Sequence, residues 1–592
     1  MCGITAYIGD KNGAEVVVDG LKRLEYRGYD SWGLAAKEDG KIISHKQVGK
    51  IGGFELKRDL PKFSGPVCIG HTRWATHGGV TEKNSHPHFS CDKKIAVVHN
   101  GIVENYQELR ADLEKKGHKF ISQTDTEVIA HLIEQAAKKE KDFVQAVRKS
   151  LKLLEGSFAL AIINQENNIL IGARYGSPLV FGIGKNEYFL GSDVPAFLKY
   201  TDKVVFLDEM QLVVVDDKAK YQILDITSGK KINSKITKIE WSLNEAEKGG
   251  YPHFMIKEML EQPQVIEKTM AENEGELKRA AALIKKSKRI FVVACGTALH
   301  AGMYGSYLLA KENNLFLQPI SAGEFPHFAH LLKKDDLVIT VSQSGETADV
   351  LEAVKSAHNA GAKVLSLVNV MGSSLMRMSD SSILTKAGPE ICVLSTKAYI
   401  SQQAMFVMLS AAMKGNLKEG KKALEITKRD IEKILSKSSL QKIKKMAKKL
   451  ARVDNIYALG RGTNYPNALE ACLKIKEVSY IHAEGFAGGD LKHGPIALIE
   501  KGVPVLVFAA NDESEREIIS NAMEVKARGA EVIGIATQKN QVFDEYLPVQ
   551  PNGFYTPLAS IVYPQLLSYY IALEKKLDPD KPRNLAKSVT VK

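Results

Sequence analysis

The chain has 592 residues, of which 44% are hydrophobic and 25% are charged, and it carries a net charge of +12. This length exceeds what one hydrophobic core can organise, and it predicts about three or four domains of ordinary globular composition. No apolar run approaches the roughly 18 residues that cross a bilayer, and the N-terminus lacks the basic start and apolar stretch of a signal peptide. We therefore expect a cytoplasmic protein without membrane contact.

The basic residues do not indicate a nucleic-acid partner, because they are spread along the whole chain rather than gathered in one segment. The densest run, residues 442–449, carries Ile443, Met446 and Ala447 at helical spacing. That spacing predicts an amphipathic helix whose lysines form the solvated face. A basic protein also attracts phosphorylated metabolites through its charge.

Residues 1–220 carry the signals of an α+β layered domain. The strand-length apolar runs lie at 95–98, 158–163 and 212–215, and helical stretches lie near 103–116 and 125–138. Residues 221–278 are polar, with little periodicity. We predict that they form a linker and the approach to a second half, with a helix opening near residue 253.

The pattern changes from residue 279 onward. Two segments, 279–418 and 446–582, each alternate continuous apolar strands with helices, which predicts two α/β domains with parallel, doubly wound sheets. Their predicted strands lie at 289–294, 337–341, 363–368, 455–459, 503–508 and 531–535. Residues 294–297 and 460–463 occupy matching places after the first strand of each segment. This correspondence indicates an internal duplication.

Cys2 is the first candidate catalytic residue. If Met1 is removed, Cys2 carries both a thiol and a free α-amine, and an amine that titrates near about pH 8 can accept the thiol proton. The alternative is that position 2 merely tolerates a small residue. The six cysteines are widely scattered and include no Cys-x-x-Cys pair, which argues against a zinc site and against a disulfide framework.

Several sequence blocks accompany the Met-Cys-Gly-Ile start. They are Arg-Gly-Tyr-Asp-Ser at 27–31, His-Thr-Arg-Trp-Ala-Thr-His-Gly at 71–78, His-Pro-His at 86–88, His-Asn-Gly at 99–101 and Thr-Asp-Thr-Glu at 124–127. In content and order they resemble the N-terminal-nucleophile glutamine amidotransferases. That resemblance implies a four-layer αββα glutaminase domain, in which the Cys2 thiolate forms a thioester with glutamine and releases ammonia.

The same resemblance implies roles for four other residues. The Asn100 side-chain amide and the Gly101 backbone N–H would form an oxyanion hole for the tetrahedral intermediate. Arg73 suits the α-carboxylate of glutamine through a bidentate fork, and Asp125 suits its α-ammonium group through charge.

Three residues of the 71–78 block complete the expected glutaminase site. Thr76 and His77 would shape the glutamine pocket. Trp74 adjoins Arg73 and is bulky enough to gate a shielded passage for ammonia between the halves of the chain. Such a passage is needed because free ammonia is mostly protonated at neutral pH and would be lost to water.

The histidines of the N-terminal half do not form a convincing metal site. They are His71, His77, His86, His88 and His99, and they lie among predicted strand ends and loops. They include no helical His-x-x-x-His pair and no clear carboxylate partner. We therefore expect hydrogen-bonded structural histidines and no bound metal.

The duplicated half carries Ser-Gln-Ser-Gly-Glu-Thr at 342–347, between a predicted strand and a helix. Backbone N–H groups and hydroxyls there would converge on a phosphate at a positive helix end. This half resembles the sugar-isomerase (SIS) domain pair. The expected sugar-phosphate ligands are Thr297, Ser342, Gln343, Ser344, Thr347 and Ser395. Helix N-capping alone would explain a single Ser/Thr cluster. The phosphate-binding interpretation is favoured because such residues recur at the carboxyl edge of the sheet, where folds of this kind bind ligands.

Four more blocks narrow the resemblance. They are Glu-Ala-Cys-Leu-Lys-Ile-Lys-Glu at 470–477, Ala-Glu-Gly at 483–485, Leu-Lys-His-Gly-Pro at 491–495 and the tail at 582–591. With them, nearly the whole chain is similar to the isomerizing glutamine–fructose-6-phosphate aminotransferase family, which opens the pathway to UDP-N-acetylglucosamine. The implied substrates are L-glutamine and D-fructose 6-phosphate, and the implied products are L-glutamate and D-glucosamine 6-phosphate.

This resemblance also implies the sugar chemistry. Lys587, in the active-site tail 583–592, would form a Schiff base at C2 as a neutral amine, and Glu477 would move a proton between C1 and C2. Lys474 would balance charge nearby. No metal and no organic cofactor are required. The family forms homodimers with shared sugar sites, so His493 of the partner subunit would help to open the fructose ring.

The sequence fits other enzyme families and a non-catalytic role less well. Amidophosphoribosyltransferase needs an acidic phosphoribosyl-binding loop followed by threonines, and asparagine synthetase needs a Ser-Gly-Gly-x-Asp-Ser loop; the sequence has neither. A non-catalytic sugar-phosphate sensor built on SIS domains would have no need for all four of Cys2, Glu477, His493 and Lys587. The positions that depart from the family pattern are Ala298, Asp490 and Trp32. They bear on binding affinity more than on reaction type.

Overall fold

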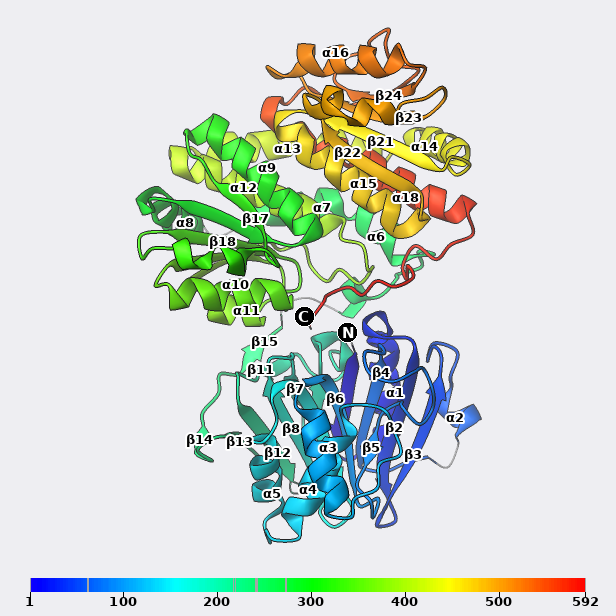
Figure 1. Ribbon diagram of the computed structural model, residues 1–592, viewed down its shortest axis with the longest axis vertical. Helices are drawn as coiled ribbons and strands as arrows, with labels where there is room; N and C mark the ends of the chain where they lie inside the picture. Colours follow the sequence, from blue (N-terminus) through cyan, green and yellow to red (C-terminus); the bar gives the residue numbers. More distant parts are fainter. Residues whose placement is uncertain are drawn as a thin grey trace. The chain divides into compact units, whose positions relative to one another are not determined.

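The computed structural model describes residues 2–60, 63–216, 218, 220–239, 243–271 and 274–590. The chain forms two compact units (Figure 1): one runs to Ala246 and also takes in the C-terminal segment from Ala586 onward, and the other spans Glu247–Leu585. Met1 and the last two residues of the predicted tail, 591 and 592, lie outside the described residues. Within the described residues, no helix has the length and apolar character needed to cross a membrane.

The N-terminal unit contains two antiparallel sheets. The eight-stranded sheet has the order β15-β11-β9-β10-β1-β4-β2-β3, and the seven-stranded sheet has the order β14-β13-β12-β8-β7-β6-β5. The first comprises β1 Gly3–Ile8, β2 Ser31–Glu38, β3 Lys41–Val48, β4 Val67–Arg73, β9 Val180–Ile183, β10 Tyr188–Gly191, β11 Lys203–Phe206 and β15 Thr237–Lys238. The second comprises β5 His88–Phe89, β6 Ile95–Val103, β7 Gly156–Asn164, β8 Ile169–Tyr175, β12 Gln211–Asp216, β13 Tyr221–Asp225 and β14 Lys231–Ile232.

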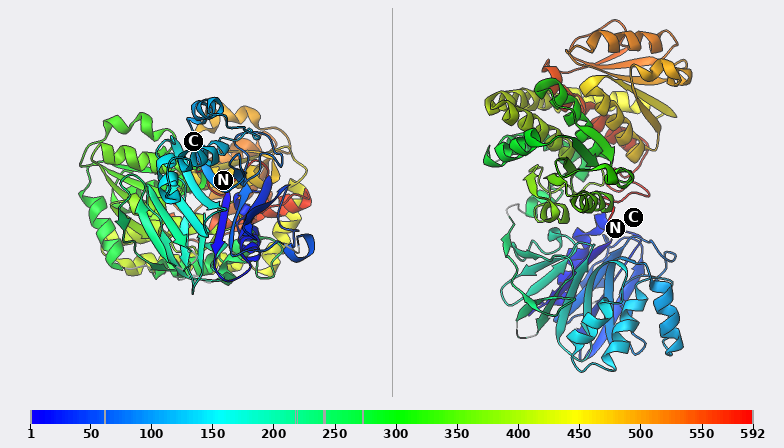
Figure 2. Two further views of the ribbon diagram at one scale, coloured as in Figure 1. Left: turned by 90° about the horizontal axis from the view of Figure 1, so that it is seen from below. Right: turned by 60° about the vertical axis from the view of Figure 1, so that its left-hand side comes forward.

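Helices cover the outer faces of these sheets (Figure 2). They are α1 Gly13–Arg23, α2 Leu56–Asp59, α3 Tyr106–Lys115, α4 Glu127–Ala137 and α5 Phe143–Leu151. Between the sheets, Ile69 of β4 and Val98 of β6 belong to one apolar cluster, while Ile129 of α4 and Val97 of β6 belong to a second cluster beneath the helices. Helix α1 packs on β1 and β4. The predicted four-layer αββα arrangement is confirmed.

The N-terminal unit extends beyond its predicted end at residue 220, because β13, β14 and β15 continue its two sheets. The predicted linker, 221–278, also contains α6 Phe254–Leu260, α7 Gln262–Met270 and the start of α8 Glu274–Lys286. The sequence signal was weak because β14 and β15 lie at sheet edges, where polar residues such as Lys231 and Thr237 are partly or fully exposed.

The second unit contains two five-stranded parallel sheets, ordered β17-β16-β18-β19-β20 and β22-β21-β23-β24-β25. The first comprises β16 Ile290–Ala294, β17 Gln318–Ser321, β18 Leu337–Ser342, β19 Lys363–Val368 and β20 Ser381–Leu384. The second comprises β21 Asn455–Gly460, β22 His482–Ala487, β23 Pro504–Ala509, β24 Glu531–Ala536 and β25 Glu545–Pro548. Both sheets follow one strand order, so the predicted duplication is confirmed.

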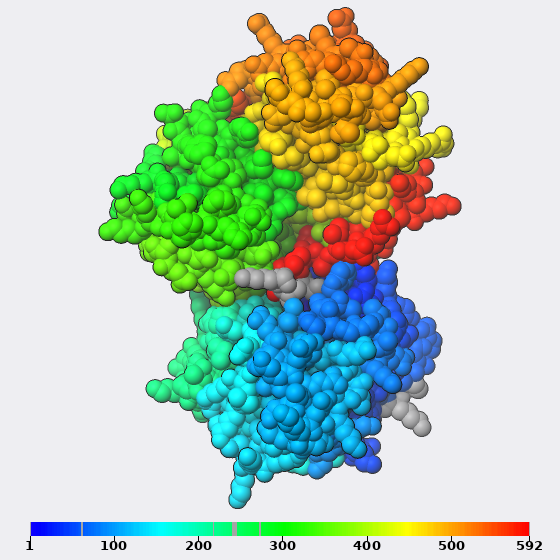
Figure 3. Space-filling view, viewed as in Figure 1, coloured from blue at the N-terminus to red at the C-terminus, as the bar shows by residue number. Residues whose placement is uncertain are grey.

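Helices pack around both parallel sheets of this unit. They are α9 Gly296–Asn313, α10 Ala348–Asn359, α11 Ser374–Met378, α12 Lys397–Lys414, α13 Leu417–Ile434, α14 Lys437–Leu450, α15 Tyr465–Ser479, α16 Glu515–Lys526, α17 Pro557–Ser560 and α18 Val562–Glu574. In the space-filling view the residues of this unit run from green to red (Figure 3). Helix α14 buries Ile443, Met446 and Ala447, as its predicted amphipathic pattern requires.

A buried polar network joins the two duplicated subdomains through Asn467 of α15. Its Oδ1 accepts hydrogen bonds from the Tyr399 hydroxyl at 2.9 Å and from Gln403 Nε2 at 3.3 Å, both on α12. Its Nδ2 donates to the Pro557 carbonyl at 2.7 Å and to Ser560 Oγ at 3.0 Å. Asn467 is fully buried, so these partners have little access to water as a substitute.

Replacing Asn467 with leucine keeps a similar volume but removes a hydrogen-bond partner from four buried polar groups. Ser560 Oγ and the Pro557 carbonyl still bond to each other at 3.2 Å, whereas the Tyr399 hydroxyl and Gln403 Nε2 lose their bonds to Asn467. We expect the Asn467→Leu variant to lose about 3 kcal/mol of unfolding free energy, because each stranded buried group costs about 1–3 kcal/mol before relaxation. Urea unfolding followed by circular dichroism measures this loss. The matched control is Asn359→Leu on the exposed end of α10, which should change stability by less than about 0.5 kcal/mol. Equal effects in both variants would contradict the assigned role of the network.

Candidate active sites

Cys2 directly precedes β1, where three residues hold it in place. Its Sγ accepts a hydrogen bond from the Trp74 backbone N–H at 3.2 Å. Its carbonyl accepts hydrogen bonds from Asn100 Nδ2 at 2.9 Å and from Arg27 Nε at 3.3 Å. Burial raises the pKa of the Cys2 thiol, so a neighbouring base is needed to generate the thiolate. Arg27 belongs to one of the family blocks of the sequence, but only the structure shows that its side chain anchors Cys2.

Asn100 and Gly101 lie together on β6, as an oxyanion hole requires. His71 Nε2 lies 3.0 Å from Asn100 Oδ1, which orients the amide so that its nitrogen faces Cys2. An amide nitrogen carries two hydrogens, and only one is used by the Cys2 carbonyl. Gly101 has φ of +135°, and a Cβ there would lie 2.0 Å from the Ser157 carbonyl oxygen. Only glycine therefore fits this position.

Arg73, His77 and Asp125 form a neighbouring cluster. The Arg73 guanidinium donates to the carbonyls of Gly79 at 3.2 Å, Gly78 at 3.3 Å and His77. It therefore holds the 77–79 turn in addition to any contact with substrate. Asp125 Oδ2 accepts the Val103 N–H at 2.8 Å, and its Oδ1 lies 4.0 Å from His77 Nδ1. The exposed Thr76 contacts the same imidazole, with Oγ1 3.3 Å from Nδ1.

The predicted structural histidines are hydrogen bonded in the N-terminal unit. His71 contacts the His99 carbonyl at 3.0 Å, and His99 Nδ1 lies 2.9 Å from Thr126 Oγ1. His86 Nδ1 accepts the His99 N–H at 3.3 Å, while His88 Nε2 lies 3.1 Å from Thr124 Oγ1. Burial lowers the pKa of His71 to about 3 and also lowers the pKa values of His86, His88 and His99. All four imidazoles are consequently neutral at physiological pH.

One face of α15 carries the central cluster of the second site. Glu470, Lys474 and Glu477 are spaced by four and three residues, so they share this face. Lys474 Nζ lies 2.6 Å from Glu477 Oε2 and 3.4 Å from Glu470 Oε1. It also donates to Thr297 Oγ1 at 3.0 Å, and Thr297 in turn donates to Glu470 Oε1 at 3.0 Å. This cluster joins α15 to the first turn of α9.

Two residues of this cluster were missed in the sequence: Glu470 and His300, whose Nδ1 lies 2.7 Å from Glu470 Oε2. The four-residue spacing of Glu470 and Lys474 on one helix could have indicated Glu470 from the sequence. Burial lowers the pKa of Lys474, but attraction to Glu470 and Glu477 outweighs burial and raises the pKa overall. Lys474 is therefore a charged residue, as the expected charge-balancing role requires.

The turn predicted to bind phosphate, residues 342–347, follows β18. Ser342 Oγ accepts the Gly345 N–H at 2.9 Å, and Ser344 Oγ accepts the Glu346 N–H at 3.2 Å. Gly345 has φ of +67°, and a Cβ there would lie 2.2 Å from Ser373 Oγ, so the turn requires glycine. Gln343 lies in the same turn. The turn leads into the N-terminus of α10, whose backbone N–H groups suit an anion.

Thr347 and Thr297 begin the helices that follow two adjacent strands. Within the described residues, Thr347 makes no side-chain capping hydrogen bond to α10. Strand β16 leads into α9 and the neighbouring β18 leads into α10, at the place where the strand order reverses. Open α/β sheets bind ligands at this switch point. The structure thus brings the predicted turn and Thr297 to one edge of one sheet.

The remaining predicted residues lie apart from this cluster. Ser395 Oγ donates to Glu390 Oε2 at 2.9 Å, so its hydroxyl is engaged within its own loop. His493 ends the short helix Asp490–His493 and is exposed. Lys587 belongs to the compact unit formed by the N-terminal half. The C-terminal unit by itself therefore brings together Thr297, Lys474 and Glu477, but not Lys587.

Known proteins resemble this chain along its whole length. It is 44% identical over 606 residues to the glutamine–fructose-6-phosphate aminotransferase (isomerizing) of Pyrococcus horikoshii, with all of both chains covered. It is 43% identical over 614 residues to the enzyme of the same name from Clostridium tetani, again with all of both chains covered. The chain belongs to the glutamine–fructose-6-phosphate aminotransferase family. As a member of that family, it is an enzyme of the amidotransferase class.

Domain comparisons agree with this family membership. A glutamine amidotransferase domain matches residues 71–199, and SIS domains match residues 283–412 and 449–574. The solved C-terminal domain of glucosamine-fructose-6-phosphate aminotransferase from Francisella tularensis is 33% identical, with a TM-score of 0.53. It covers 56% of this chain and 99% of that domain. The aminotransferase family's two kinds of domain thus correspond to the two sites described above.

The buried histidines predict how stability depends on pH. Because their folded pKa values are depressed, only the unfolded chain takes up their protons below about pH 6.5, so stability falls as pH decreases from there toward about 3. We expect a loss of about 1 kcal/mol per buried histidine between about pH 7.5 and 5.5. Urea unfolding monitored by hydrogen exchange of β4 and β6 amides measures it. Carboxylates titrate mainly at lower pH, so a flat profile in this window would contradict the prediction.

Proposed function

We propose that Cys2 frees ammonia from glutamine and that the cluster around Lys474 and Glu477 serves its addition to fructose 6-phosphate, giving glucosamine 6-phosphate and glutamate. The observation that carries this proposal is the Thr297–Lys474–Glu477 cluster at the switch point of a SIS sheet, in a chain that also positions Cys2 beside Asn100. A sugar sensor would need only the first of these two sites.

At the first site, the Cys2 thiolate attacks the side-chain amide carbon of glutamine. The carbonyl oxygen then becomes an oxyanion, which the second hydrogen of the Asn100 amide and the Gly101 N–H stabilise. Collapse of this intermediate expels ammonia after proton transfer and leaves a thioester. Water hydrolyses the thioester, releases glutamate and restores the thiol. Asp125 and Arg73 would hold the two charged ends of the substrate.

At the second site, the Lys587 amine condenses with the C2 ketone of the open sugar and releases water. Ammonia then displaces the lysine to give a ketose imine. Glu477 removes a proton from C1 and returns a proton to C2, which converts the ketose imine into an aldose amine. The Lys474 ammonium, 2.6 Å from a Glu477 oxygen, holds this carboxylate in place. The 342–347 turn and Thr297 would bind the sugar phosphate.

We also propose a cytoplasmic homodimer in which His493 of the partner subunit completes each sugar site. The exposure of this histidine at the end of its short helix supports the idea, since a ring-opening residue otherwise gains from a shielded position. Mixed dimers test whether the sugar sites are shared between subunits. An inactive His493 variant mixed with an inactive Glu477 variant would regain part of the synthase activity only if each site takes His493 from the partner subunit.

The Schiff-base lysine can be identified directly. Two carboxylates hold Lys474 in its charged form, which makes it a poor nucleophile, so the proposed Schiff base is assigned to Lys587 of the tail. Borohydride reduction of the protein with fructose 6-phosphate should therefore attach the sugar to Lys587, as peptide mass spectrometry would show. The Lys587→Ala variant should lose the adduct. An adduct on Lys474 would overturn the assignment.

The role of Cys2 predicts a separable defect. The Cys2→Ala variant should release no glutamate from glutamine, yet it should still make glucosamine 6-phosphate when ammonium is supplied, because the sugar cluster is untouched. Chromatographic assay of both products measures this. The matched control is Cys472→Ala, which removes a buried thiol from α15 and should keep glutaminase activity. Glutamate release by Cys2→Ala would contradict the nucleophile assignment.

We propose that Trp74 gates the transfer of ammonia. Its backbone N–H contacts Cys2 Sγ at 3.2 Å, and its ring lies edge-on to Tyr29 with centroids 5.5 Å apart. A Trp74→Ala change keeps the backbone contact and removes the ring. We expect glutamate formation to continue while the ratio of glutamate to amino sugar rises severalfold. An unchanged ratio would reject the gate, and Tyr29→Phe, which keeps the ring contact, should behave like the unaltered protein.

A further inference from the structure

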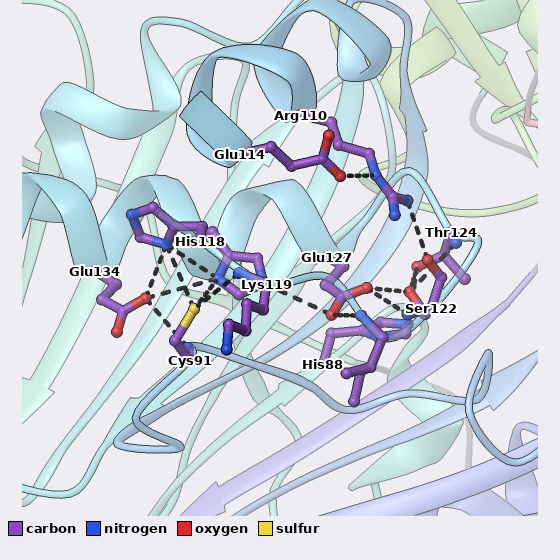
Figure 4. A network of polar contacts seen from close by, with 12 residues as sticks. His88, Cys91, Arg110, Glu114, His118, Lys119, Ser122, Thr124, Glu127 and Glu134 are labelled. Carbon is purple, nitrogen blue, oxygen red and sulfur yellow. Dashed lines mark hydrogen bonds and ion pairs between the residues drawn. The ribbon is translucent and has the colours of Figure 1, made fainter. Parts of the chain in front are cut away.

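Four potential metal ligands meet in the N-terminal unit, outside the predicted glutaminase site. They are Cys91 in the loop after β5, His118 after α3, and His131 and Glu134 on α4. Figure 4 labels three of them, Cys91, His118 and Glu134. One ligand atom from each residue lies within 4.8 Å of all the others. The two histidines and Glu134 are buried, while Cys91 is exposed and gives access from solvent.

The distances between the ligand atoms match those around a tetrahedral zinc ion. His118 Nδ1 and His131 Nδ1 are 3.3 Å apart, and Cys91 Sγ lies 3.7 Å and 3.5 Å from them. Glu134 Oε2 lies 3.1 Å from His118 Nδ1 and 3.6 Å from His131 Nδ1. Usual zinc bond lengths at tetrahedral angles require about 3.3 Å between two nitrogens and about 3.6 Å between nitrogen and sulfur.

Outer partners orient both imidazoles toward the centre of the cluster. His118 Nε2 lies 3.1 Å from Gln135 Oε1, and His131 Nε2 lies 3.6 Å from Glu127 Oε1. The Gln135 oxygen can accept a hydrogen bond from His118 Nε2, which leaves the His118 Nδ1 lone pair facing inward. The Glu127 carboxylate lies too far for a hydrogen bond to His131 Nε2, but its charge favours a proton on that nitrogen. Two such lone pairs at 3.3 Å repel each other unless a cation or a proton lies between them.

The other two ligands are also held by backbone donors. The Lys119 N–H donates to Cys91 Sγ at 3.4 Å, a contact that fixes the position of the sulfur. The Cys91 N–H donates to Glu134 Oε2 at 3.1 Å, and the Asp92 N–H donates to Glu134 Oε1 at 3.4 Å. The carboxylate is therefore fixed beside the sulfur. A hydrogen-bonded cluster without metal would not require all four groups to converge on one point.

We propose that Cys91, His118, His131 and Glu134 bind one zinc ion as a structural site. Two nitrogens, one sulfur and one oxygen suit zinc, and four protein ligands leave no open coordination position for catalysis. On binding, the Cys91 thiol gives its proton to solvent and the thiolate bonds to the ion, without oxidation or reduction. The proposal departs from the sequence-based expectation of no metal, because the ligands are separated by 27, 13 and 3 residues in the chain.

Such a site would position the glutamine pocket, and this part rests on the proposed function. Glu127, the outer partner of His131, also accepts the Ser122 N–H at 2.7 Å and the Ile121 N–H at 2.9 Å. Ser122 Oγ lies 3.0 Å from Thr124 Oγ1, which precedes Asp125. The ion would thus fix both ends of the 118–131 segment that carries the ammonium-binding carboxylate.

Metal content provides the first test. The full chain, expressed with zinc and purified without a metal-affinity tag or chelator, should hold about one zinc per chain. Cys91→Ser and His118→Gln should lose most of it. The matched controls, Cys68→Ala in β4 and His358→Gln on α10, should retain it. Little zinc in the unaltered protein, or zinc retained by Cys91→Ser and His118→Gln, overturns the site.

Cobalt substitution and kinetics complete the test. Cobalt-loaded protein should show a sulfur-to-cobalt charge-transfer band and tetrahedral visible bands that Cys68→Ala keeps and Cys91→Ser loses; octahedral bands without charge transfer would overturn the ligand set. Removing zinc should raise KM for glutamine severalfold with a smaller change in kcat, and ammonium-dependent synthesis should not change. An unmoved KM would refute the positioning role. Metal content and spectra require no activity, so they remain decisive even if the proposed reaction fails.

Discussion

The buried ammonium of Lys474 is the interaction on which the C-terminal unit's site depends. It pairs with two carboxylates on its own helix and donates a hydrogen bond to Thr297 on the other subdomain. Removing it would leave Glu470, which is fully buried, without its cation, and an uncompensated buried charge costs several kcal/mol. The same contact therefore stabilises the packing of α15 on α9 and links Glu477 to Thr297 at the edge of the first parallel sheet.

The cluster around Cys2 relies mainly on neutral buried histidines, beside the ion pair of Arg27 with Asp193. Burial keeps His71 uncharged, so it can orient the Asn100 amide without bringing a positive charge next to the oxyanion hole. The arrangement costs stability at low pH, because a neutral buried imidazole resists protonation. The buried histidines near Cys2 thus act by orienting hydrogen bonds, whereas the groups around Lys474 act by attraction between opposite charges.

The proposed zinc cluster lies beside helix α4, outside the strands β1, β4 and β6 that carry the proposed active-site residues. Glu127 is the physical link: its carboxylate faces His131 on one side and the Ser122 turn on the other. Helix α4 therefore connects the two sites. Its first residue, Glu127, follows the segment that carries Asp125, and its later residues His131 and Glu134 are proposed zinc ligands. A metal in such a place acts on substrate affinity through the backbone rather than through chemistry at the thiol.

The sequence by itself determined the fold class, the duplication and, through family resemblance, the αββα layering, and it predicted the principal site residues. Those features follow from local patterns: apolar strands, turns that only glycine can form, as at Gly345, and contiguous motifs. The tertiary structure alone decided the extent of the N-terminal unit, the role of Glu470 and His300, and the meeting of Cys91 with His118 and His131. Residues far apart in sequence become neighbours only when layers pack, and edge strands with polar side chains leave too little periodic signal to be found beforehand.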